Sequence, residues 1–164
     1  MFLDLSKALK SEGAVQQVDM AGKLEDIDFR GDTLKFSTPV SVTGKVTNNG
    51  DVLNFIANVS GNIAVQCYRC LRETTKPFSF EMKEILSDQP CENEEIVCFQ
   101  GDGIDLTDLL VQQILLQVPM KYLCDEQCKG LCAQCGSDLN EDTCTCIKET
   151  IDPRMEVLKN LFKE

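Results

Sequence analysis

Residues 52–67 read VLNFIANVSGNIAVQC, and this stretch determines the expected fold class. Almost every second residue is apolar, whereas the residues between are mainly Asn, Ser and Gln. A period of two over this length predicts a long β-strand with one buried face. The positions expected on the buried face are Leu53, Phe55, Ala57, Val59, Ile63, Val65 and Cys67.

Strands are predicted on both sides of this stretch. Valines alternate with polar residues over 40–46, and Asn48-Asn49-Gly50-Asp51 joins them to residue 52, which is a strong hairpin signal. After a turn at 67–70, alternation at 78–82 predicts a returning strand. Together with shorter strand-like patterns, these features predict an antiparallel, barrel-like sheet. The shorter patterns lie at 14–20, 24–29 and 95–99.

Two helices are predicted after the strands. Residues 105–118, DLTDLLVQQILLQV, carry an apolar stripe that we expect to pack on the sheet; Asp105 can cap the helix, and Pro119 ends it. Asp152-Pro153 can begin a short C-terminal helix. The expected fold is therefore α+β, in one compact unit. Its parts are a β-rich core over 1–120, a cysteine-rich zinc module over 121–148 and a helical end over 149–164.

The composition of the 164-residue chain is that of an ordinary globular domain, with 43% hydrophobic and 26% charged residues. No stretch approaches the roughly 20 apolar residues that cross a bilayer, and the first residues do not resemble a secretory signal. We therefore expect a cytoplasmic protein without a membrane partner. Cytosolic thiols are kept reduced, so clustered cysteines there are more often metal-binding or catalytic than disulfide-bonded.

The residue types that are missing from the chain exclude several classes of function. The chain has no histidine, which excludes Ser-His and Cys-His nucleophile pairs and imidazole metal ligands. It has no tryptophan and few other aromatic residues to stack on bases. Its net charge of −11 repels a polyanion and suits a basic partner protein, although acidity also serves solubility. No small-molecule substrate is evident.

Six of the ten cysteines lie within residues 124–146, CDEQCKGLCAQCGSDLNEDTCTC. Zinc prefers four thiolates in a tetrahedron, and two cysteines separated by two residues can reach one ion when the chain turns tightly. Cys132 and Cys135 form such a pair and are followed by Gly136. After a spacer comes a second pair, Cys144 and Cys146, with only one residue between them. A four-thiolate zinc site is the favoured interpretation, against a redox role, disulfides or inert thiols. Its ligands would be Cys132, Cys135, Cys144 and Cys146.

A second zinc site is predicted from the four cysteines Cys67, Cys70, Cys124 and Cys128. It would hold the tail, which is the part of the chain from residue 121 onward, on the sheet. The sequence leaves open whether one zinc ion or two are bound. A lone Cys-x-x-Cys is also a redox signature, so a thiol–disulfide redox protein using Cys67 and Cys70 is the alternative function. Four thiolates leave no position for water, so neither zinc would be catalytic. We expect Cys91 to be a loop thiol and Cys98 a buried small residue.

The order of motifs resembles one known family. The segments are CYRCL (67–71), IDLTDLLVQQILLQVPMKYLC (104–124), CKGLCAQCGSDLN (128–140), CTC (144–146) and IDPRMEVLKNL (151–161). They resemble the YceD-type large ribosomal RNA subunit accumulation proteins, and most of all the Firmicutes members with a cysteine-rich tail. The family's motifs fall on Cys67, Arg69 and Cys70, then on Gly130, Leu131, Cys132, Cys135, Gly136, Leu139 and Asn140, and then on Asp152, Pro153 and Arg154.

The resemblance implies a non-enzymatic factor in ribosome biogenesis, one that supports synthesis, processing or stability of 23S rRNA. It leaves open whether the chain binds rRNA or a pre-ribosomal particle directly, or acts through a basic ribosomal protein. The residues add a hypothesis of their own, a binding rim of basic side chains on an acidic body. Ordinary surface charge is the alternative. The rim consists of Arg69, Arg72, Lys76, Lys129 and Arg154.

Overall fold

The computed structural model describes residues 1–29, 32–89, 93, 95–119 and 121–146. Within this part of the chain it has nine strands and one helix. The predicted C-terminal helix over 149–164 lies outside the described residues. The strands are β1 (Phe2–Asp4), β2 (Val15–Gly22), β3 (Ile27–Phe29), β4 (Asp32–Phe36), β5 (Val40–Asn48), β6 (Leu53–Gln66), β7 (Glu73–Ser87), β8 (Ile96–Cys98) and β9 (Gly103–Asp105), and the helix is α1 (Thr107–Gln117).

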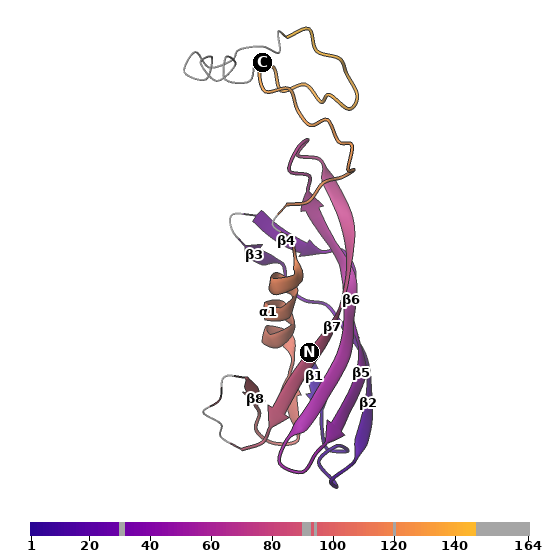
Figure 1. Ribbon diagram of the computed structural model, residues 1–164, viewed down its shortest axis with the longest axis vertical. Coiled ribbons are helices and arrows are strands. Elements are labelled where there is room, and N and C mark those ends of the chain that lie inside the picture. Colours follow the sequence, from indigo (N-terminus) through magenta and orange to yellow (C-terminus); the bar gives the residue numbers. More distant parts are fainter. Residues whose placement is uncertain (30–31, 90–92, 94, 120, 147–164) are drawn as a thin grey trace, which may run out of the picture.

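Strand β6 is the centre of the main sheet (Figure 1). On one side it pairs antiparallel with β7 along its whole length, from Leu53 opposite Leu86 to Gln66 opposite Glu73. On the other side it pairs with β5 and then with β4. The apolar positions predicted from the period of two are buried, each no more than 8% exposed. The strand prediction and the β5–β6 hairpin are therefore confirmed.

The sheet is open in the part of the chain that the structure describes. Its order is β2-β5-β6-β4-β3, with β7 on the other side of β6 and β8 added to β7. The β7–β8 pair is parallel, unlike the other pairs. The expected α+β content is present, but the barrel-like closure is not confirmed. Among the described residues, β2 and β3 on one side and β8 on the other end the sheet and do not pair with one another, so the hydrogen bonding does not close into a barrel.

Helix α1 lies along one face of the sheet (Figure 1). Leu106, Leu110 and Ile114 are at most 1% exposed and pack in the same core as Phe55 of β6, which confirms the apolar stripe. The helix begins two residues later than predicted. Asp105 belongs instead to β9, where it pairs with β1, although its carboxylate still accepts the Thr107 N–H at 2.9 Å.

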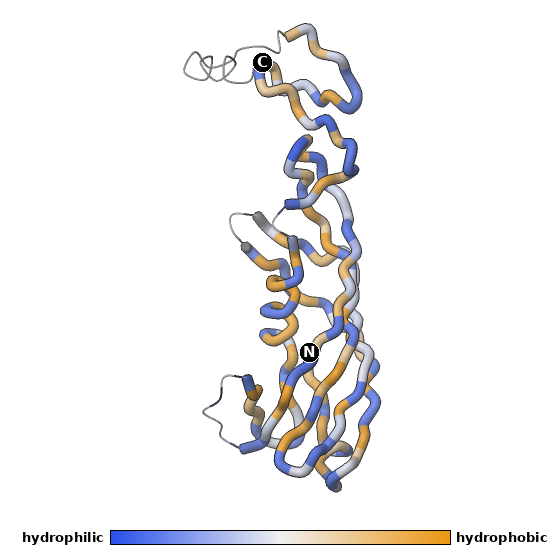
Figure 2. Tube along the Cα trace, in the orientation of Figure 1, coloured by the Kyte–Doolittle hydropathy of each residue, from blue (hydrophilic) through white to orange (hydrophobic). Residues whose placement is uncertain are grey.

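Residues 121–146 lie beyond the end of the sheet where β6 turns into β7 (Figure 1). Figure 2 shows apolar and polar positions alternating on the sheet and mixed along this last segment. Strands β1, β4 and β9 were not predicted; each has only three to five residues, a length over which a period of two is a weak signal.

Candidate metal centres

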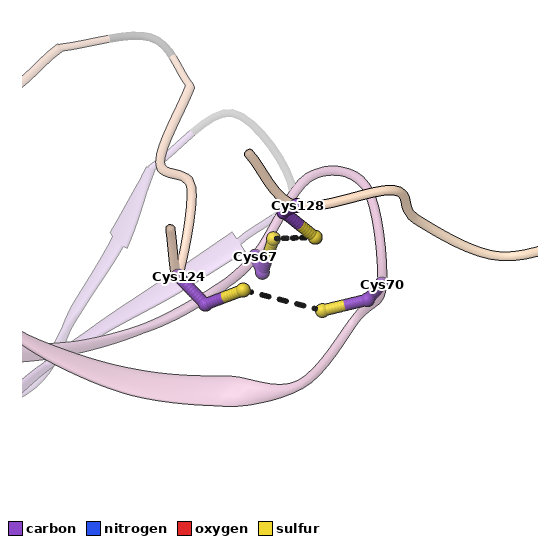
Figure 3. Close-up of side chains that lie close together, drawn as sticks. All are labelled: Cys67, Cys70, Cys124 and Cys128. Atoms are coloured by element: carbon purple, nitrogen blue, oxygen red, sulfur yellow. Dashed lines mark hydrogen bonds between the residues drawn. The ribbon is translucent and has the colours of Figure 1, made fainter. Parts of the chain in front are cut away.

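The structure gathers four cysteines at the turn between β6 and β7, which we call the inner group: Cys67, Cys70, Cys124 and Cys128 (Figure 3). Their sulfur atoms all lie within 4.8 Å of one another. Two of the sulfur–sulfur distances are 3.8 Å, from Cys67 to Cys128, and 3.6 Å, from Cys70 to Cys124. Four zinc–sulfur bonds of about 2.3 Å in a tetrahedron require edges of about 3.8 Å. The inner group therefore fits a tetrahedral metal ion.

The inner group is formed by parts of the chain that are distant in sequence, since Cys67 and Cys128 are 61 positions apart. Backbone contacts hold these parts together. Tyr68 N–H donates to the Tyr122 carbonyl at 2.8 Å, and Leu131 N–H donates to the Arg69 carbonyl at 2.9 Å. Gly130 has φ +78°, and a Cβ there would lie 2.8 Å from the Arg69 carbonyl oxygen. This close approach requires glycine.

The second gathering, which we call the outer group, comprises Cys132, Cys135, Cys144 and Cys146. Its sulfurs also lie within 4.8 Å of one another, but they are partly or fully exposed, whereas Cys67, Cys70 and Cys128 are buried. The first pair sits on a tight turn in which Gly136 N–H donates to the Cys132 carbonyl at 2.9 Å. Gly136 has φ +74°, which suits glycine at this turn. The outer group is built from one local segment.

The electrostatics of the two groups favour a bound cation. The Cys135 and Gln134 N–H groups lower the pKa of Cys132 to about 6, because they donate to its thiolate. The Cys124 N–H acts in the same direction on the pKa of Cys67, also to about 6. By contrast, the neighbouring Cys128 sulfur and burial raise the pKa of Cys124 to about 12. Four thiols so close together cannot all ionise unless a cation offsets their charge.

Polar side chains link the two groups. The amide nitrogen of Asn140 donates to the Cys128 sulfur at 3.4 Å, and its oxygen accepts the Lys129 N–H at 2.7 Å. Arg72 forms ion pairs with Asp138 and Glu141 of the outer segment. Neither Asp138 nor Glu141 was singled out from the sequence, and Asn140 was named only as a motif position. The only signal for Asn140 was its place in the GLCxxCGxxLN motif.

The structure brings three of the five residues of the predicted binding rim to the inner group. Arg69 donates to the Cys128 carbonyl at 2.7 Å, and Lys76 donates to the Cys124 carbonyl at 3.2 Å. Arg72 is the ion-pair partner described above. Lys129 is exposed on the tail, and Arg154 lies outside the described residues. The first three cations therefore hold the tail, and the rim remains a prediction.

The remaining predictions concern the other thiols. Cys91 lies outside the described residues, and Cys98 ends β8 with an exposed side chain, so its predicted burial was wrong. The eight cysteines of the inner and outer groups are free of disulfide bonds. The Cys67–Cys70 pair lies between antiparallel strands and faces two further thiols, not at a helix N-terminus that would activate it.

The fold and the two cysteine groups define a class of protein: an open β-sheet with one covering helix and two sets of four thiols that could each hold a metal ion, one between the β6–β7 turn and the C-terminal segment and one within that segment. No helix in the described part of the chain is both long and apolar enough to span a membrane.

Residues 56–162 match the family described as large ribosomal RNA subunit accumulation protein YceD, and the chain belongs to this family. The matched region contains both cysteine groups.

Several proteins are similar over most of the chain. The Bacillus subtilis protein YlbN, described as uncharacterized, is 27% identical over 90% of this chain and 88% of its own length. A chloroplastic maize protein, YCED homolog 1, named for large ribosomal RNA subunit accumulation, is 24% identical over 92% of this chain and 64% of its own length. The Arabidopsis thaliana protein of the same name is 24% identical over 77% of this chain and half of its own. No solved structure matches.

Proposed function

We propose that this chain is a non-enzymatic factor in assembly of the large ribosomal subunit, one that supports synthesis, processing or stability of 23S rRNA. The observation that carries the proposal is the match to the YceD family over residues 56–162. The maize and Arabidopsis relatives, which are named for large ribosomal RNA subunit accumulation, support it. We expect it to act in the cytoplasm on a pre-ribosomal particle, through rRNA or through a basic ribosomal protein.

We further propose that each cysteine group holds one zinc ion. The chain offers four sulfur ligands at each place, a set that suits zinc and not the oxygen-seeking cations Mg²⁺ or Ca²⁺. The sulfur spacing supports tetrahedral geometry. A zinc ion with four thiolates has no open position for water, so its role would be structural. The inner ion would hold the tail on the sheet, and the outer ion would stabilise the local fold of the segment that carries the outer group.

Depletion of the protein tests the ribosomal role. We expect depleted cells to lose 23S rRNA relative to 16S rRNA and to accumulate incomplete large subunits in a sucrose gradient. The wild-type chain should restore both, and the Cys67→Ser/Cys70→Ser variant should not. A normal ratio of the two rRNAs after complete depletion would contradict the proposed function.

The predicted binding rim needs a test that leaves the tail in place. Reversing the charges of Arg69, Arg72 and Lys76 would break contacts that hold the tail, so it would not isolate partner binding. Lys129→Glu changes an exposed side chain and preserves those contacts. Association of this variant with pre-ribosomal particles at the wild-type level would count against a role for Lys129 in the rim.

A further inference from the structure

The turn between β6 and β7 presents two large apolar side chains to solvent. Tyr68 and Leu71 are each 60% exposed, although they flank buried Cys67 and Cys70 of the inner group. Two such side chains three residues apart on one tight turn place apolar surface in solvent beside the inner group. An exposed side chain alone means little. The backbone of the turn provides an independent observation.

Leu71 has φ 59° and is the only non-glycine residue with positive φ in the described part of the chain. Side chains with a Cβ avoid this conformation because the Cβ crowds the following carbonyl oxygen. The outer group has glycine at the equivalent place, since Gly136 follows its Cys-x-x-Cys pair with φ 74°. Glycine would make the inner turn without strain. The leucine side chain is therefore not explained by the fold.

Hydrogen bonds to the tail fix the conformation of the turn. Tyr68 and Arg69 exchange backbone hydrogen bonds with the tail, and the Arg69 side chain donates to the Cys128 carbonyl. Apolar side chains on such a fixed turn lose little entropy when a partner covers them. Rigid aromatic side chains are typical anchors of protein interfaces.

The charges around the turn favour a protein over RNA as the partner. Arg72 is paired with Asp138 and Glu141, and Lys76 donates to the Cys124 carbonyl. The Lys121 ammonium lies 4.7 Å from the centroid of the Tyr68 ring, on a face that a stacking base would use. The whole chain carries a net charge of −11, which repels phosphates. Exposed carboxylates lie near the turn at Asp125 and Glu126, and a third, Glu73, is 3.8 Å from the Lys35 ammonium.

We propose that Tyr68 and Leu71 form a docking surface for a basic protein of the large ribosomal subunit. An apolar recess of that protein would receive the two side chains, and its cationic residues would meet Asp125 and Glu126. The ribosomal source of the partner rests on the proposed function. The apolar anchor and the charge of the partner rest on the turn itself.

A binding measurement tests the docking surface. The zinc-loaded full chain is immobilised and exposed either to the proteins extracted by salt from purified large subunits or to protein-free 23S rRNA. We expect retention of one or a few basic proteins, and an affinity about tenfold weaker or worse for Leu71→Gly and for Tyr68→Ala. Leu116→Ala, which changes a leucine that is 77% exposed on α1, should bind as the wild type does.

Leu71→Gly is expected to remove strain from the turn, so loss of binding by a variant whose free energy of unfolding is at least that of the wild type is not due to misfolding. Equal retention of the same proteins by Leu71→Gly and the wild type would overturn the docking surface. Retention of 23S rRNA alone, weakened by the same variants, would replace the protein partner with RNA. If depletion lowers 23S rRNA and both variants restore it fully, the proposed function stands and the docking surface fails. If depletion leaves 23S rRNA unchanged, the proposed function fails.

Discussion

The residue that follows each Cys-x-x-Cys pair has positive φ, and the two pairs differ there. Leu71 occupies this place in the inner group, and Gly136 occupies it in the outer group. A non-glycine residue in this region carries roughly 1–2 kcal/mol of strain, whereas glycine adds chain entropy to the unfolded state. Leu71→Gly should therefore raise the free energy of unfolding by about 0.5–1 kcal/mol, measured by urea denaturation of the zinc-loaded protein.

The reverse change at the other turn is the matched control. Nothing lies within 4 Å of a Cβ built on Gly136, so Gly136→Ala adds strain without a clash. It should destabilise the fold of the segment that carries the outer group by about 1 kcal/mol. A loss of stability in Leu71→Gly would show that the leucine side chain serves the fold after all.

Asn140 links the two cysteine groups through its side-chain amide. Asn140→Asp replaces the N–H that donates to the Cys128 sulfur with a negative charge, which repels the thiolates. We expect zinc affinity at the inner group to fall by about tenfold to a hundredfold, as is common when a group that supports a metal ligand is changed. Competition with a chelator measures the affinity. Asn58→Asp, on the exposed side of β6, should leave it unchanged.

At the scale of elements, substitution of the two Cys-x-x-Cys pairs should affect the tail differently. Cys132→Ser/Cys135→Ser removes half of a local group and should unfold only residues 131–146, because the inner group still holds the tail. Cys67→Ser/Cys70→Ser should release the whole tail from the sheet. Limited proteolysis distinguishes the two, since only the second variant should be cut near residues 119–124. Equal protection of that segment in both variants would contradict the role of the inner group.

The outer group should lose its metal first. Its cysteines are partly or fully exposed, whereas three of the four inner cysteines are buried. Variants that each retain one group, treated with an excess of chelator, should release zinc faster from the outer group. Faster release from the inner group would show that burial does not protect that metal.

Strand β6 and helix α1 could be predicted because each has a long and regular apolar period of its own. The start of the helix could not, since Asp105 is held by pairing between β9 and β1, and that pairing joins residues about a hundred positions apart. Strands as short as β1 and β9 have no period to detect. Whether a sheet closes depends on how its edge strands pair with one another, which the local pattern of each strand does not define.

For the whole molecule, cysteine spacing was enough to suggest which sulfurs share a group, because a pair separated by two residues can turn onto one ion. The spacing did not indicate which residues the nearby basic side chains contact. Arg69, Arg72 and Lys76 are close in sequence and read as a surface patch, yet their partners lie 48 to 69 residues away in the tail. Such contacts become visible only once the tail is folded back.

The central claim is that two four-thiolate zinc sites, one of them between sheet and tail, organise the C-terminal half of the molecule. Elemental analysis of the chain, purified without added metal, tests it most directly when it is compared with Cys67→Ser/Cys70→Ser. The account predicts two zinc ions per wild-type chain and one in the variant. Equal zinc content in the two proteins, or no zinc in the wild type, would contradict it.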